Sequence, residues 1–321
     1  ALIEPIATQK VIDSHEGFEA VLRALQKAEI IGFDHTPKGV HVYPKAAPVA
    51  VQQECVEYFF PIREGLLDVG FFEPELLPLY NTIFSGNHTV IAYNVKELLH
   101  SLHALNITPE VDFEDVSILK CLADGLANTT GLDFALLHHA LPVENRAYGV
   151  YRLFEIYYGA LQEEEKRLYC QVELPLIKVL FEMEAEGVCV NEGILEELSK
   201  KYNDELKVLS AEIHELAGEI FNINSTQQLG KILFDKLAIG AGTKKAKTTK
   251  SYKTTAEELE KYVGEHPIIP LILRYRQVQK LNSTYLDGFK PLIKNGKVHT
   301  TYSQVNTTTG RLSSANPNLQ N

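Results

Sequence analysis

Residues 300–321 read Thr-Thr-Tyr-Ser-Gln-Val-Asn-Thr-Thr-Thr-Gly-Arg-Leu-Ser-Ser-Ala-Asn-Pro-Asn-Leu-Gln-Asn. The stretch begins with the side-chain alternation of a β-strand and continues as a row of small hydrogen-bonding side chains with one cation, Arg311. Gly310 allows the backbone to approach a ligand closely. This polar, aperiodic pattern indicates either a loop that closes a domain or a surface that binds a partner.

The motif T-x-T-G-R-L-S-S-x-x-P-N-L-Q-N in this stretch resembles the segment that opens the palm of family A DNA polymerases, the family of bacterial DNA polymerase I. The resemblance implies that Arg311, Asn318 and Gln320 lie along the minor groove of a primer–template duplex near the primer terminus. Every base pair offers acceptors in that groove, so arginine and amide donors can check pair shape without reading sequence. The other DNA contacts expected in this segment are Gln304, Thr309 and Ser313.

Length and composition set the class of protein. The chain has 321 residues, enough for two domains with separate cores, and 45% of its residues are hydrophobic. It contains no apolar run near the roughly 18 residues of a membrane span and no signal peptide at its start. Its four cysteines are far apart and lack the paired spacing of a metal site. We expect a cytoplasmic protein with reduced thiols and no membrane partner.

Charge is distributed unevenly along the chain. The formal net charge is -11, but residues 222–321 carry about +9 and the remainder about -20. A phosphate backbone is therefore expected to bind the later part of the chain.

Residues 1–165 are expected to form an α/β domain. The hydrophobic pattern predicts helices over 12–28, 76–84, 95–105, 115–122, 132–141 and 146–162, and strands over 30–34, 40–43, 49–51 and 89–93. This order predicts a sheet with helices packed on it. In the polymerase resemblance the region is the 3′–5′ exonuclease domain, which has a ribonuclease-H-like fold.

The resemblance also implies a two-metal nuclease site, and most of its carboxylates are absent here. The family motif F-D-x-E reads Phe33-Asp-His-Thr36, so Asp34 remains and Thr36 replaces the glutamate. The motif N-x-K-x-D ends in Leu98, and the third motif, Y-x-x-x-D, finds no acid between residues 146 and 154.

One aspartate cannot hold two divalent cations, because each needs several oxygen ligands. We therefore expect an inactive domain kept as a scaffold, with Asp34 as a vestigial position and no metal bound. The alternative is an active 3′–5′ exonuclease in which Glu97, Glu114 or Asp115 replaces a lost carboxylate. Glu97 lies one position early in its motif, which rotates it by about 100° on a helix.

Residues 166–298 are expected to be mainly α-helical. Apolar residues at helical spacing run from Tyr169 to Met183, a short strand follows at 188–190, and Asn191 caps a long helix that ends at Gly218. The motif M-E-x-x-G-V-x-V at 183–190 adds to the resemblance, which makes this region the base and long helix of the polymerase thumb. The acidic run at 163–165 is expected to be a linker or a helix start.

Three parts of this region are expected to contact DNA phosphates. A capping box of Ser225 and Gln228 predicts a helix start with free N–H groups, beside Asn224 and Thr226, although an ordinary capped helix explains it equally well. Residues 240–255 form a loop without apolar period, and the resemblance makes it the thumb tip. The lysines of this loop expected to bind DNA are Lys244, Lys245, Lys247, Lys250 and Lys253.

The third part is a helix predicted over 268–281, after a second capping box at Thr255 and Glu258. The motif Y-R-x-x-x-K-L-x-S-T-Y at 275–285 resembles the polymerase helix that follows the primer backbone. The phosphate contacts implied are Arg276, Lys280, Asn282, Ser283 and Thr284. Alternatively, Arg274 and Arg276 pair with acidic groups of the protein itself.

Segment 299–321 is expected to start the polymerase palm. The palm aspartates that bind Mg²⁺ and the nucleotide-binding fingers of the family lie beyond it, so we expect no catalyst of nucleotidyl transfer and no bound cofactor within residues 1–321. The sequence therefore predicts the N-terminal portion of a replication and repair polymerase, with primer–template DNA and the palm and fingers as partners. The alternatives are the active exonuclease and a non-catalytic module that binds duplex DNA.

Overall fold

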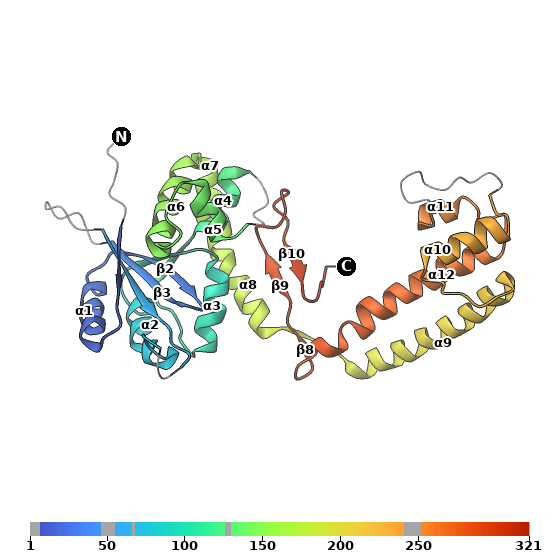
Figure 1. Ribbon diagram of the computed structural model, residues 1–321, viewed down its shortest axis with the longest axis horizontal. Coiled ribbons are helices and arrows are strands. Elements are labelled where there is room, and N and C mark those ends of the chain that lie inside the picture. Colours follow the sequence, from blue (N-terminus) through green and yellow to red (C-terminus); the bar gives the residue numbers. More distant parts are fainter. Residues whose placement is uncertain (1–6, 46–54, 66–67, 126–129, 241–251, 321) are drawn as a thin grey trace. The chain divides into compact units, whose positions relative to one another are not determined.

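The computed structural model describes residues 7–45, 55–65, 68–125, 130–240 and 252–320. The chain divides into two compact units (Figure 1): Ala1–Glu186 together with Thr300–Asn321, and Gly187–His299. The functional domains expected from the sequence, 1–165, 166–298 and 299–321, stay a prediction. None of the described helices is long and apolar enough to cross a membrane.

The first unit contains a six-stranded mixed sheet with the order β1-β4-β3-β2-β5-β6. Its strands are β1 (Thr8–Val11), β2 (Ile30–Thr36), β3 (Gly39–Lys45), β4 (Val56–Pro61), β5 (Thr89–Ala92) and β6 (Asp112–Asp115). The pairs β1–β4, β2–β5 and β5–β6 are parallel, and β2–β3 and β3–β4 are antiparallel. The strands predicted at 30–34, 40–43 and 89–93 are confirmed. The strand predicted at 49–51 lies outside the described residues.

Ten helical segments of the first unit lie among the described residues. They are α1 (His15–Leu25), η1 (Glu73–Leu76), α2 (Leu77–Phe84), α3 (Val95–Ala104), α4 (Val116–Asp124), α5 (Leu132–His138), α6 (Arg146–Ala160), α7 (Glu163–Leu168), η2 (Tyr169–Glu173) and α8 (Leu174–Glu186). The predicted helices are confirmed, with ends that differ by up to three residues. The acidic run starts α7, where the Gln162 N–H donates to Glu165 at 2.8 Å.

Two hydrophobic clusters account for the packing of the sheet. Phe33 of β2 is buried with residues of α1 and α2, whereas Tyr43 of β3 is buried with residues of α4, α5 and α6. Successive side chains of a strand point to opposite faces, so the two clusters cover the two faces. Gly32 permits the close contact of α6, since a Cβ there would lie 2.3 Å from the Ala147 carbonyl oxygen.

The end of the chain also belongs to the first unit. Strands β9 (Thr301–Ser303) and β10 (Ser313–Ala315) pair antiparallel, with Ser303 opposite Ser313. The buried Thr300 holds the pair together, because its Oγ1 lies 2.7 Å from the Ser314 Oγ and donates to the Pro317 carbonyl oxygen at 2.7 Å.

The second unit is built mainly of helices. Its elements are β7 (Val188–Cys189), α9 (Glu192–Ala217), α10 (Thr226–Gly230), η3 (Lys231–Lys236), α11 (Ala256–Glu260), α12 (Ile268–Lys280), η4 (Leu281–Asp287), η5 (Lys290–Leu292) and β8 (Lys297–Val298), and β7 pairs antiparallel with β8. Helices α9 and α12 lie side by side (Figure 1). As predicted, the Asn191 side chain caps α9 and Gly218, with φ of +68°, ends it.

The two predicted capping boxes of this unit form incompletely. The Ser225 Oγ accepts the Gln228 N–H at 3.4 Å, but the Gln228 side chain accepts the Asn222 N–H instead of closing the box. Thr255 precedes α11 without a side-chain cap, and Glu258 pairs with Lys261 at 2.7 Å. The predicted second box is therefore wrong, although a helix does begin there.

Candidate functional site

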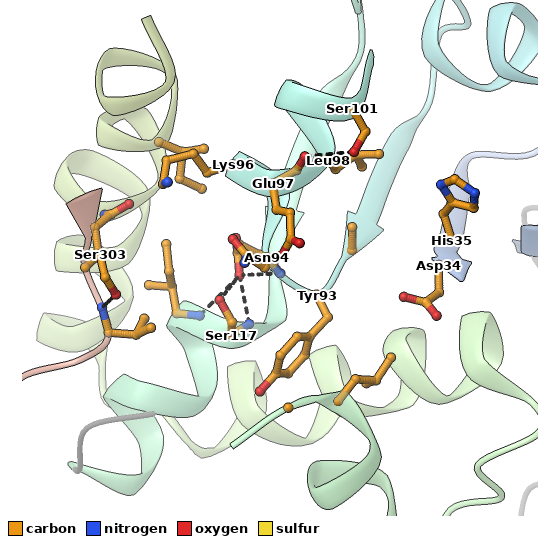
Figure 2. A pocket seen from close by; sticks show the side chains of 18 of the residues that line it. Asp34, His35, Tyr93, Asn94, Lys96, Glu97, Leu98, Ser101, Ser117 and Ser303 are labelled. Carbon is orange, nitrogen blue, oxygen red and sulfur yellow. Dashed lines mark hydrogen bonds between the residues drawn. The ribbon is translucent and has the colours of Figure 1, made fainter. Parts of the chain in front are cut away.

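The first unit contains an open pocket of about 640 Å³ (Figure 2). Its wall includes Asp34 and His35 of β2, the start of α3 from Asn94 to Glu97, and residues 301–306 around β9. Asp34 and His35 lie on the opposite side of the pocket from Lys96 and Ser303 (Figure 2). The nuclease motifs read from the sequence therefore meet in one place.

An arginine pairs with Asp34, one of the aspartates that line this pocket. Arg146, the first residue of α6, donates from Nε to Asp34 and from Nη1 to Asp133. Burial raises the pKa of Asp34, and the attraction of Arg146 opposes that shift. The guanidinium supplies the positive charge that a metal ion would supply to a carboxylate in a nuclease. The pairing of Arg146 with Asp34 was not predicted from the sequence, although Arg146 opens the helix in which the third nuclease motif was sought.

The three acids considered as replacement ligands bind other protein groups. Asp115 is buried at the start of α4, where it accepts the N–H groups of Ser117 at 2.8 Å and Val95 at 2.7 Å. Burial raises the pKa of Asp115, and it also raises that of Glu114, which accepts the hydroxyl of Tyr169 at 2.6 Å. These acids act as a helix cap and as hydrogen-bond acceptors.

Glu97 completes this set, because its carboxylate accepts the Asn94 side-chain amide at 2.9 Å. The Thr36 hydroxyl donates to the Gly39 carbonyl oxygen at 3.2 Å, within the turn between β2 and β3. Across the described ranges, no group of three or more His, Cys, Asp or Glu side chains could hold a metal ion. The residues present do not fit the two-metal site that the nuclease resemblance implies.

The second unit presents a polar face at the end of α12. Lys280, the last residue of α12, and Ser283 and Thr284 of the following segment η4 are all exposed. This set fits the row of phosphate contacts expected from the sequence.

Two other residues of the same motif face the protein interior. The Arg276 guanidinium donates to the carbonyl oxygen and the hydroxyl of Thr254. Asn282 is 3% exposed, and its amide donates to Asn203 at 3.1 Å and Asp287 at 3.2 Å. Their interpretation as phosphate contacts conflicts with this geometry, because helical rotation turns them inward.

The remaining candidates of the second unit are placed in part. Asn224, Thr226 and Lys253 are exposed, and Ser225 is half-buried with its hydroxyl bonded to Gln228. Arg274 pairs with Glu205 at 2.7 Å, as the alternative reading of that arginine expected. Four of the five loop lysines lie outside the described residues: Lys244, Lys245, Lys247 and Lys250.

The candidates of segment 300–320 fall into two groups. Thr309, Arg311 and Asn318 are exposed, and Ser313 is half-buried. The amide of Gln304 instead donates to the Glu173 carboxylate at 2.7 Å, and that of Gln320 donates to the Leu312 carbonyl oxygen at 2.9 Å. The two glutamine amides that were predicted to contact DNA therefore support the fold of this segment.

Comparison with known proteins gives a consistent family. The family model described as DNA polymerase family A matches residues 192–321. DNA polymerase I of Lactococcus lactis subsp. lactis is 48% identical over 162 residues, which are 50% of this chain and 18% of that protein. DNA polymerase I of Caldicellulosiruptor bescii is 31% identical over 333 residues, which cover 95% of this chain and 38% of that protein. Thermostable DNA polymerase I of Thermus aquaticus is 41% identical over 232 residues, which cover 65% of this chain and 28% of that protein.

A solved structure shares the fold. The POL domain of Pol1 from M. smegmatis, in complex with DNA primer-template and dNTP, aligns with a TM-score of 0.74 and 23% sequence identity. The alignment covers 98% of this chain and 56% of that chain. The chain thus spans well under two thirds of the length of its relatives. The resemblance seen in the sequence is confirmed: residues 192–321 match DNA polymerase family A, and the chain is similar to part of bacterial DNA polymerase I.

Proposed function

We propose that this chain is the part of a DNA-directed DNA polymerase that holds primer–template duplex during synthesis in replication and repair. One observation carries the proposal. The stretch that matches the family, residues 192–321, is also the stretch in which Lys280 and Arg311 are exposed cations. Neither side chain has an ion pair among the described residues. An exposed cation without an ion pair can bind a DNA phosphate without first breaking an ion pair within the protein.

The proposed contacts divide by the part of DNA that they reach. Lys280, Ser283 and Thr284 bind phosphates of the primer strand, whereas Arg311 and Asn318 donate into the minor groove. Further proposed backbone contacts are Asn224, Ser225, Thr226, Lys253, Thr309 and Ser313, with Lys244, Lys245, Lys247 and Lys250 of the thumb tip. Arg276, Asn282, Gln304 and Gln320 are not included among the proposed direct contacts, because each donates a hydrogen bond to a protein group.

The proposed domains follow the family. Residues 1–165 form a ribonuclease-H-like exonuclease domain, 166–298 the thumb, and 299–321 the start of the palm. The mixed sheet with helices on both faces supports the first assignment, and the pair of long helices α9 and α12 supports the second. Mg²⁺ and the carboxylates for nucleotidyl transfer belong to the palm, which with the fingers is the partner of this chain.

The front domain is proposed to be inactive as a nuclease. Asp34 is bound by Arg146, and Asp115, Glu114 and Glu97 bind other protein groups. The purified protein, supplied with Mg²⁺ or Mn²⁺ and a 3′-labelled single strand, should release no nucleotide. Release that disappears in Asp34→Asn would establish the exonuclease alternative.

Arg311→Ala tests the polymerase assignment in the full-length enzyme that carries this chain. A charged hydrogen bond made near the reacting end is worth about 2–3 kcal/mol, so primer extension should fall by roughly 30- to 160-fold. Duplex affinity should change by about threefold or less, because the phosphate contacts remain.

Lys207→Ala is the matched control, because Lys207 is an exposed cation of α9 that pairs with Asp204. Equal losses of extension and affinity in Arg311→Ala would contradict the assigned role. Duplex binding without primer extension by the full-length protein would support the non-catalytic module.

A further inference from the structure

A buried carboxylate joins three elements of the first unit. Glu184 of α8 is 5% exposed. Its Oε1 accepts hydrogen bonds from the Lys96 ammonium of α3 and from the Tyr302 N–H of β9, each at 2.6 Å. Its Oε2 lies 2.6 Å from the His100 Nε2. We call Lys96, His100 and Glu184 the Glu184 cluster.

The buried charge of Glu184 restricts the movement of β9 relative to α8. A buried carboxylate is strongly unfavourable unless a cation and hydrogen-bond donors surround it. The Lys96 side chain is only 13% exposed, so both partners of the ion pair are largely removed from water. Any movement of β9 away from α8 would remove a donor from the buried carboxylate, and short, charge-assisted hydrogen bonds oppose such movement.

The lysine of the cluster comes from a nuclease motif. Lys96 is the lysine of Asn94-Val-Lys-Glu-Leu98, the motif that has lost its metal-binding aspartate. Figure 2 places Lys96 on the Ser303 side of the pocket, far from Asp34. Its ammonium donates to Glu184 of α8, the carboxylate that also accepts the Tyr302 N–H of β9.

A second contact fixes the same strand. Just after β9, the Gln304 amide donates to the carbonyl oxygen of Glu173 at 3.0 Å and to its carboxylate at 2.7 Å. Strand β9 in turn pairs with β10, and Arg311 lies on the connection between them. The place of Arg311 thus depends on where β9 is held.

We propose that the Glu184 cluster positions segment 300–320 for its contacts with DNA, and that Glu184 is the central positioning residue. A nuclease-like domain without its metal ligands would then keep a task in polymerisation, through Lys96 and His100. The DNA part of this inference rests on the proposed function, whereas the attachment of β9 does not.

Amide hydrogen exchange tests the attachment in the protein without DNA. Lys96→Met removes the cation and keeps the aliphatic stem, and Glu184→Gln removes the charge with little change in shape. Both should accelerate exchange of the Tyr302 amide and its neighbours in 300–320 by about tenfold or more. Exchange in α9 and α12 of the second unit should remain within about twofold of the original protein.

Lys178→Met is the control, because Lys178 lies on α8 with a 79% exposed side chain and only a distant partner, Glu182 at 4.0 Å. Lys96→Arg should restore most of the protection, since it returns the charge. Unchanged exchange in 300–320 for both Lys96→Met and Glu184→Gln would overturn the proposal.

Primer extension by the full-length enzyme tests the consequence for DNA. Lys96→Met should lower the extension rate by about tenfold and change duplex affinity by less than about threefold, since the contacts of α12 are intact. Accelerated exchange with unchanged extension would overturn the positioning role. Absence of duplex binding by the original protein would instead refute the proposed function. The exchange measurement is made without DNA, so its result does not depend on that binding.

Discussion

Replacement of Lys280 by alanine should change the salt dependence of duplex binding by a defined amount. Lys280 is exposed at the end of α12, and no ion pair engages it within the described part of the chain. A cation that neutralises one DNA phosphate contributes about 0.9 to the slope of log affinity against log salt concentration. Loss of Lys280 should therefore reduce the slope by about 0.9.

The change in salt-dependence slope determines how far the affinity deficit of Lys280→Ala shrinks as salt increases. Between 50 and 200 mM salt, a slope difference of about 0.9 makes the deficit of the variant roughly 3.5-fold smaller at the higher concentration. Fluorescence anisotropy with a labelled primer–template duplex measures both affinities. Substituting several DNA sequences should give the same slope change, because a phosphate contact carries no sequence information.

Two further variants serve as controls for the slope change expected in Lys280→Ala. Lys207→Ala removes an exposed lysine that pairs with Asp204, and it should leave the slope unchanged. Arg276→Ala should lower thermal stability without altering the slope, because its guanidinium binds Thr254. An unchanged slope in Lys280→Ala, or an equal change in Arg276→Ala, would refute the assignment of these two side chains.

Three other variants test the fold around the site by chemical denaturation. Gly32→Ala should destabilise the protein by about 1–3 kcal/mol or more, because the added Cβ would meet the Ala147 carbonyl oxygen; an unchanged unfolding midpoint would contradict this close contact. Asn282→Ala should lower the free energy of unfolding by roughly 1–2 kcal/mol, since it removes the hydrogen bonds that this buried amide donates to Asn203 and Asp287, and a neutral effect would argue against its internal role. Asp34→Asn tests a pH dependence, because burial raises the pKa of Asp34 in the folded state, against the attraction of Arg146. The stability that the protonated Asp34 contributes is present below about pH 4 and is lost as pH rises through the raised pKa, so the variant should gain stability relative to the original over that interval. A relative gain that shrinks with rising pH would show the opposite shift.

Sequence patterns predicted the strands and helices well where the signals were local. Three strands of the sheet, β1, β4 and β6, were not predicted, and the two edge strands show the limit. Strand β6 reads Asp112-Phe-Glu-Asp115, and the short strand β1 at the other edge of the sheet is mostly exposed. Edge strands are half solvated and carry polar residues, so they lack the apolar run by which β2 and β5 are recognised.

Residue identity and local hydrogen bonds were enough to recognise three features from the sequence alone: the family resemblance, the absence of three of the four carboxylates in the nuclease motifs that the resemblance implies, and the ends of helices such as α9. Only the tertiary structure decided which polar groups remain available. Arg146 reaches Asp34 across 112 positions of sequence, and Gln304 reaches Glu173 across 131. A planar donor has the same chemistry on a DNA-binding surface and in the protein interior, and only its partners in space distinguish the two. The physical reason is that hydrogen-bond satisfaction depends on long-range packing, which neither periodicity nor a motif records.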